Sequence, residues 1–104
     1  MSFKESEFKY YSISYNNHQL FEAVISVSTD KNAVREIRFV KNSAPVPTPD
    51  IIGTQIYVYY SISRFNDIIT ILREEKPLQL MADTDAKFGA ILSSSEPVGE
   101  EEGV

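Results

Sequence analysis

The segment that decides the fold is residues 54–76, TQIYVYYSISRFNDIITILREEK. Apolar side chains alternate with other residues through 54–60, which predicts a half-buried strand. From Ser63 onward the apolar spacing changes to three and four residues, which predicts an amphipathic helix over 63–75. Ser63 is a suitable N-cap and Pro77 a suitable stop. A strand therefore leads directly into a helix, and we expect that helix to cover one face of a sheet.

The segments before and after it predict further strands. Residues 8–15, 19–28 and 33–41 are rich in strand formers and are separated by turn residues, which predicts two successive hairpins. Residues 77–82 and 87–93 flank a turn and predict a C-terminal hairpin, in which Gly89 marks a bulge or a close backbone approach. The expected fold class is α+β, a twisted antiparallel sheet with one helix. The expected core is Phe21, Ile25, Val27, Ile37, Phe39, Ile56, Val58, Phe65, Ile68, Ile69 and Leu72.

Two segments have no strand or helix pattern. Residues 1–7 are mostly polar and are expected to form a loose arm. Residues 42–53 contain Pro45, Pro47 and Pro49, which cannot lie in a central strand, so an extended loop is expected. This loop is either a connector or a segment that binds a partner or crosses between subunits.

The length and charge distribution predict one domain with a tail. The chain has 104 residues and a net charge of −5, and this length fits a single domain, expected at 1–95. Residues 96–104 hold four glutamates and no basic residue; without these four, 11 of the 15 acidic residues remain beside 10 basic ones. The tail at 96–104 is expected to be flexible, and either keeps the chain soluble or competes with nucleic acid for a basic face.

The residue types argue against an enzyme. The chain has no cysteine, which excludes disulfides and thiolate chemistry. Its single histidine, His18, is expected in an exposed turn without an orienting partner, and Asp83 and Asp85 fit a turn better than a cation site. No phosphate loop or metal-ligand cluster is present in the sequence. We therefore expect no catalysis, no cofactor and no metal. With no long apolar run and a polar N-terminus, a cytoplasmic chain without a membrane span is expected.

Tyrosines indicate a binding surface instead. All six lie on predicted strands, and Tyr10/Tyr11 and Tyr59/Tyr60 are adjacent pairs, so one member of each pair must face away from the helix. Exposed aromatic rings on a sheet are a common platform for unpaired bases, and nearby cations can contact phosphates. The predicted nucleic-acid-binding residues are Tyr10, Tyr57, Tyr59, Arg35, Arg38 and Lys41. Alternatively, the same rings form an oligomer interface of an accessory or protein-interaction subunit.

The order of elements resembles a known fold. Three strands, a long loop, a fourth strand and a helix entered directly from it, over Phe8 to Lys76, resemble the Whirly and positive-cofactor-four type of single-stranded-DNA-binding fold. Residues 54–76 carry the resemblance most closely, and the ending Ser95-Glu96-Pro97-Val98-Gly99-Glu100 is similar to small cyanobacterial proteins placed in that fold. The resemblance implies homo-oligomers that present curved sheets to single-stranded DNA or RNA. An Sm-like RNA-binding barrel is a second possibility.

Overall fold

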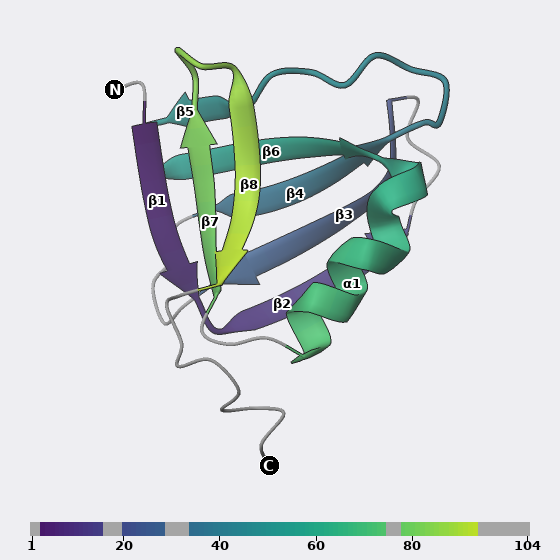
Figure 1. The fold of residues 1–104 in the computed structure, drawn as a ribbon, viewed down its shortest axis with the longest axis horizontal. Helices are drawn as coiled ribbons and strands as arrows, with labels where there is room; N and C mark the ends of the chain where they lie inside the picture. The colour runs from purple at the N-terminus through teal and green to yellow at the C-terminus, as the bar shows by residue number, and fades with distance from the viewer. Residues whose placement is uncertain (1–2, 16–19, 29–33, 75–77, 94–104) are drawn as a thin grey trace.

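A computed structural model describes residues 3–15, 20–28, 34–74 and 78–93 of the chain. Along these residues lie eight strands and one α-helix (Figure 1). The expected mixed α+β architecture, mostly strand with one helix, is therefore confirmed. The elements are β1 (Phe3–Phe8), β2 (Tyr10–Tyr15), β3 (Phe21–Ser28), β4 (Arg35–Val40), β5 (Asp50–Ile52), β6 (Gln55–Ser61), the 3-10 helix η1 (Ile62–Arg64), α1 (Phe65–Glu74), β7 (Leu78–Asp83) and β8 (Phe88–Ser93).

The strands form two sheets rather than the single antiparallel sheet that was expected. A five-stranded sheet has the order β2-β3-β4-β6-β5, and a three-stranded sheet has the order β1-β7-β8. Every pairing is antiparallel except that of β4 with β6, which is parallel. β4 and β6 are parallel because the proline-containing loop 41–49 carries the chain from the end of β4 to β5, which then turns into β6 (Figure 1). β6 therefore runs in the same direction as β4. Gly53 in that turn has a φ of 62°, which suits glycine.

The first strand was not predicted. Residues 1–7 were expected to be a loose arm, but β1, which covers residues 3–7 of it, pairs with β7 over six residue pairs, from Phe3 opposite Asp83 to Phe8 opposite Leu78. The expected strand 8–15 is thus divided near Lys9, where the chain passes from one sheet to the other. Residues 3–7 escaped prediction because their charges hide any alternation, whereas long-range pairing with β7 decides their conformation.

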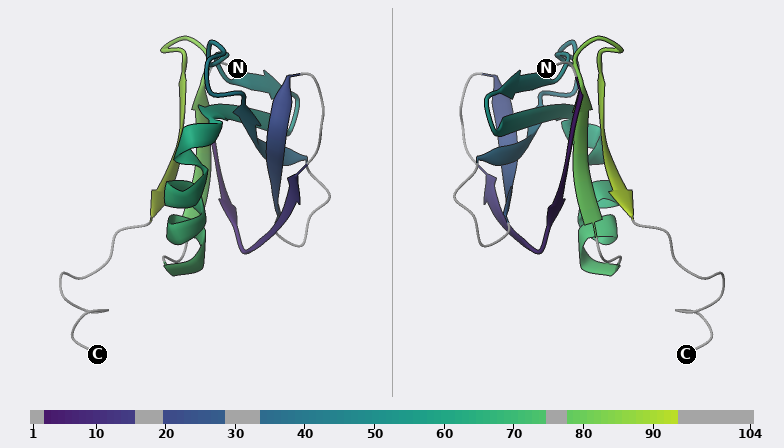
Figure 2. Two further views of the ribbon diagram at one scale, coloured as in Figure 1. Left: turned by 90° about the vertical axis from the view of Figure 1, so that its right-hand side faces the viewer. Right: turned by 90° about the vertical axis from the view of Figure 1, so that its left-hand side faces the viewer.

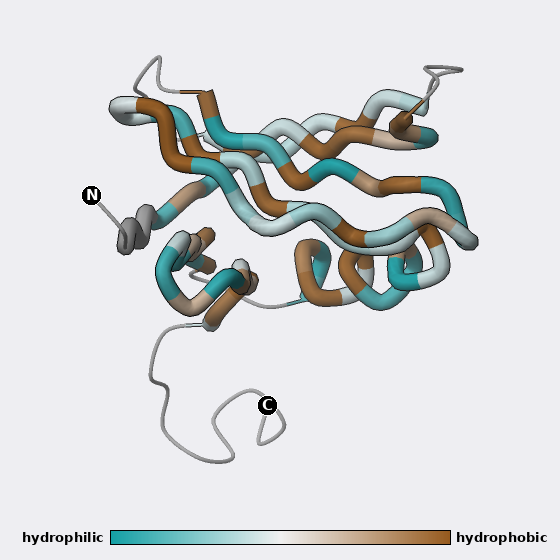
Figure 3. Tube along the Cα trace, turned by 90° about the horizontal axis from the view of Figure 1, so that it is seen from above, coloured by the Kyte–Doolittle hydropathy of each residue, from teal (hydrophilic) through white to brown (hydrophobic). Residues whose placement is uncertain are grey.

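The two sheets and the helix make two layers. One layer is the five-stranded sheet, and the other is α1 beside β1-β7-β8 (Figure 2). Viewed from above, hydrophilic and hydrophobic residues alternate along the strands of the larger sheet (Figure 3). We call the side of this sheet that faces the second layer its inner face, and the opposite side its outer face. The core between the layers includes Phe8, Ala23, Ile25, Val27, Ile37, Phe39, Ile56, Val58, Phe65, Ile68, Leu72, Leu78, Leu80 and Ala82.

Nine of the eleven expected core residues belong to this buried set, and two differ. Ile69 is partly buried against the core. Phe21 is half-buried and contacts outer-face residues instead, because the register of β3 with β4 shifts between Phe21 and Ala23. Such a bulge reverses the face to which the preceding side chains point. The layers also touch at Gly89, where an added Cβ would lie 2.7 Å from Cγ1 of Val58, in agreement with the expected close approach.

The helix begins through a 3-10 turn. Ser61, not Ser63, caps that turn, and its Oγ accepts a hydrogen bond from the Ser63 backbone N–H at 3.3 Å. The extra turn moves the cap two residues upstream of the expected one. α1 buries Phe65, Ile68 and Leu72 against the inner face. Among the described residues, no helix is long and apolar enough to span a membrane. The expected stop at Pro77, the turn at His18 and the tail 96–104 lie outside the described residues.

Candidate nucleic-acid interface

The outer face of the five-stranded sheet carries a cluster of aromatic rings around one arginine. The guanidinium carbon of Arg38 lies 4.3 Å from the ring centroid of Tyr57, 5.0 Å from that of Phe21 and 5.9 Å from that of Tyr59. Its Nε donates a hydrogen bond to Oε1 of Glu36 at 2.8 Å, and its Nη1 to the Tyr59 hydroxyl at 3.3 Å. We call these five residues the Arg38 cluster.

Strand register accounts for the cluster. In the parallel pairing, Arg38 lies opposite Tyr59 and Glu36 opposite Tyr57, so the four side chains share one face. Phe21 joins them because of the bulge in β3, and its ring centroid lies 6.2 Å from that of Tyr59. A third hydrogen bond, from the Tyr57 hydroxyl to Oε1 of Gln55 at 3.0 Å, holds the Tyr57 ring in place. The rings are therefore fixed by the sheet before any ligand binds.

Glu36 neutralises the cluster's cation. The Arg38 and Glu36 side chains are 26% and 24% exposed. Partial burial acts to lower the pKa of Arg38, but the hydrogen bond and charge of Glu36, together with the Tyr59 contact, outweigh burial and raise that pKa. Within the described part of the chain, two of the five guanidinium N–H groups are used by these bonds. The remaining N–H groups are available to a ligand or to water, and the charge is always present.

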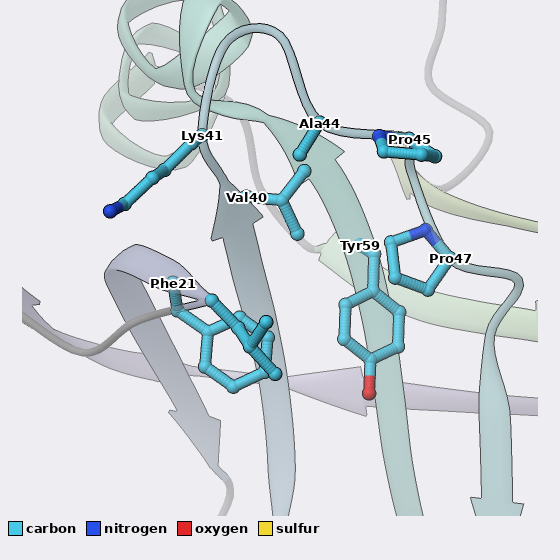
Figure 4. Close-up of a pocket in the computed structure, with 8 residues that line it drawn as sticks. Phe21, Val40, Lys41, Ala44, Pro45, Pro47 and Tyr59 are labelled. Carbon is cyan, nitrogen blue, oxygen red and sulfur yellow. The ribbon is translucent and has the colours of Figure 1, made fainter.

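An apolar pocket adjoins the cluster at the end of β4 (Figure 4). Its volume is about 320 Å³. Tyr59 and Pro47 stand side by side in its wall, and Lys41 lies at its rim on the chain segment that leaves β4 (Figure 4). The same Tyr59 and Pro47 also line a second pocket of about 200 Å³, beside Lys87. The full lining of the larger pocket is Leu20, Phe21, Val40, Lys41, Ala44, Pro45, Pro47 and Tyr59.

The structure brings together four of the six predicted binding residues. Arg38, Tyr57 and Tyr59 are in contact, and Lys41 lies at the pocket that Tyr59 lines. Tyr10 lies on the same face, since Ser14 on its strand is level with Val24 and Arg38. Tyr10 is four residues and two strands away, about 17 Å from the cluster at the usual strand spacings.

Arg35 does not belong to this face. It has the same strand parity as the core residues Ile37 and Phe39, so its side chain leaves β4 on the inner side. Its Nε and Nη1 are buried without a hydrogen-bond partner. Arg35 and Arg38 are three residues apart, and side chains at odd separations in a regular strand point to opposite faces. The prediction that both meet phosphates on one surface is therefore corrected.

The sequence reasoning missed Phe21, which it assigned to the core, and Glu36, which it did not count as part of the site. The signal for Glu36 was present, because residues 36 and 38 must share a strand face. No sequence signal revealed the bulge that turns Phe21 toward the outer face.

The remaining expectations for the site concern metals and turns. Asp83 ends β7 and supports the turn that follows, as expected for a turn aspartate: its Oδ1 accepts hydrogen bonds from the backbone N–H groups of Asp85 at 3.0 Å and Ala86 at 2.9 Å. Among the described residues, no group of three or more His, Asp or Glu side chains is placed to hold a metal ion.

No protein-family model, curated protein or solved structure matches the chain. The function must therefore be inferred from the geometry of the outer face.

Proposed function

We propose that this chain is a non-enzymatic module that binds single-stranded DNA or RNA on the outer face of its five-stranded sheet. The observation that carries this function is the guanidinium of Arg38 at 4.3 Å over Tyr57, with two further rings around it. Unpaired bases stack on aromatic rings and on guanidinium planes irrespective of sequence. The resemblance of residues 54–76 to Whirly-type proteins implies the same function.

The charges of this face indicate how such binding works. Arg38 is neutralised by Glu36, and Asp50 lies beside Tyr57 in the neighbouring strand. Lys41 is then the main cation that a phosphate meets near the pocket. Affinity should come from stacking more than from phosphate contacts, so a weak salt dependence is expected, with a log–log slope of about −0.7 for one contact to a single strand.

The test is a titration of fluorescein-labelled dT and rU oligonucleotides with the full chain at low salt. Tyr57→Leu removes the ring but keeps an apolar side chain, and it should weaken binding about 5- to 150-fold, which corresponds to one lost stack. Tyr57→Phe keeps the ring and should bind like the wild type. No binding at tens of micromolar protein, or equal loss in both variants, would refute the function.

The pocket supports a second candidate, a protein-interaction or accessory subunit. Its walls of proline and aromatic side chains suit an apolar side chain of a partner as well as a base. In this alternative the Arg38 cluster is covered by protein. Tyr57 and Tyr59 would then be protected from chemical modification of their rings in the assembled protein without nucleic acid, whereas the first function leaves them accessible until an oligonucleotide is added.

A further inference from the structure

One edge of the five-stranded sheet is long and uncharged. β2 forms that edge; all six of its residues are exposed, and none of them is charged or a proline. β5, at the opposite edge, has only three residues. Edge strands are usually short, charged or covered, because their unpaired N–H and C=O groups otherwise pair with other chains. β2 is neither short nor charged, so it is the edge at which the sheet can be extended.

Five of the six residues of β2 form a palindrome. Residues 11–15 are Tyr-Ser-Ile-Ser-Tyr and read the same in both directions about Ile13. Antiparallel pairing on a two-fold axis at Ile13 places Ile13 opposite its copy, Ser12 opposite Ser14 and Tyr11 opposite Tyr15. We propose that two copies of this chain pair through β2 in this register and form a symmetric dimer with one continuous sheet.

The inner-face side chains of β2 give this dimer an apolar contact. Tyr11, Ile13 and Tyr15 share a face with the buried Ile25, yet they are 37%, 45% and 66% exposed. At about 200 Å² for a tyrosine side chain, these fractions leave roughly 300 Å² of surface per copy. Two copies would bury about 600 Å² of it, less than the ~1,200 Å² of a standard interface, so the dimer is weak.

Charge and clearance are both compatible with a second copy. Although the chain carries a net charge of −5, β2 brings no like charges together. α1 meets β2 at Tyr15, whose ring centroid lies 5.1 Å from that of Phe65. In the dimer the two copies of Tyr15 are about 14 Å apart along the strands. This separation exceeds the 8–10 Å between the axes of packed helices, so the two Tyr15–Phe65 contacts do not collide.

The test is sedimentation equilibrium of the full chain over a concentration series. The wild type should dimerise with a micromolar Kd. Because Ile13 meets its own copy, Ile13→Lys and Ile13→Glu should each be monomeric, since each places like charges face to face. An equimolar mixture of the two variants should dimerise again, because opposite charges then meet. A wild type that is monomeric at millimolar concentration, or a mixture that stays monomeric, would overturn the inference.

Two further variants guard against a folding artefact. Ile52→Lys changes an isoleucine that is 60% exposed on the opposite edge strand, against 45% for Ile13, and should leave dimerisation unchanged. Loss of dimerisation in Ile52→Lys would assign the interface to β5.

Since the chain has no cysteine, Ile13→Cys provides a single thiol at the axis, where opposed Cα atoms lie about 4.5–5.5 Å apart. This spacing permits a disulfide, so mild oxidation should cross-link the variant. Failure to cross-link would exclude this register. The inference is independent of nucleic-acid binding.

Discussion

Glu36→Gln is expected to tighten nucleic-acid binding. Glu36 accepts the Arg38 Nε–H at 2.8 Å and cancels the charge of the cation at the centre of the Arg38 cluster. A phosphate that accepts hydrogen bonds from the far edge of the Arg38 guanidinium, away from Glu36, would lie roughly 8 Å from the Glu36 carboxylate. Repulsion at that distance in a mostly aqueous medium is about 0.5–1 kcal/mol. Its removal should lower Kd about 2- to 5-fold at low salt and steepen the log–log salt slope by about 0.7.

The assay is fluorescence anisotropy of a labelled dT oligonucleotide at several salt concentrations. Glutamine can still accept a hydrogen bond from Arg38, so this partly buried donor keeps a partner and the variant should remain folded. Asp67→Asn is the matched control, since it also frees an ion-paired arginine, Arg64 on the helix side of the molecule, and changes the net charge equally. Unchanged affinity and slope in Glu36→Gln, or the same gain in Asp67→Asn, would show that phosphates do not approach Arg38.

Three further predictions concern stability, each measured by urea unfolding followed by far-UV circular dichroism. Gly89→Ala should destabilise by about 1–3 kcal/mol, because its Cβ would lie 2.7 Å from Val58. The cost should be smaller in a Val58→Ala background, and additive costs would contradict the close contact. Burial raises the pKa of Tyr60, against smaller lowering effects of Arg64 and of a backbone hydrogen bond with Ile91. The unfolded state then loses this proton first, so stability should fall as pH rises above about 10. Tyr60→Phe should reduce this loss of stability. Identical dependence of stability on alkaline pH in the wild type and the variant would show that Tyr60 is not the group responsible. Lys87 has a φ of 65°, so Lys87→Gly should stabilise by about 1 kcal/mol; a loss of stability would show that the lysine side chain outweighs this strain.

The parts of the fold that were predictable are those with a local signal. Alternation identified β3, β4 and β6, and the change of period at residue 63 identified the helix region. The parallel pairing of β4 with β6 was not predictable, since alternation is the same for parallel and antiparallel neighbours that bury one face. Only the path of loop 41–49 distinguishes them, and proline restricts that path without specifying it.

The candidate site was predictable to the extent that strand parity held. Arg38, Tyr57 and Tyr59 were assigned to one surface, and the register of β4 with β6 places them in contact. Arg35 was assigned against parity and lies on the other face. Phe21 was assigned by parity, but a bulge in β3 reversed its direction. Bulges depend on the partner strand, which one sequence does not reveal.

The position of β1 has a consequence for how the chain is made. Its only ladder partner among the described strands is β7, so β1 cannot pair until residue 83 has been synthesised. At 5–20 residues per second that wait is roughly 4–16 s. β2 and β3 are neighbours in sequence and can pair early, whereas β1 stays unpaired until β7 has been synthesised. The charged side chains of Lys4, Glu5 and Glu7 concealed this strand in the sequence. During that interval the same charges would keep the unpaired segment solvated and oppose its aggregation with other nascent chains.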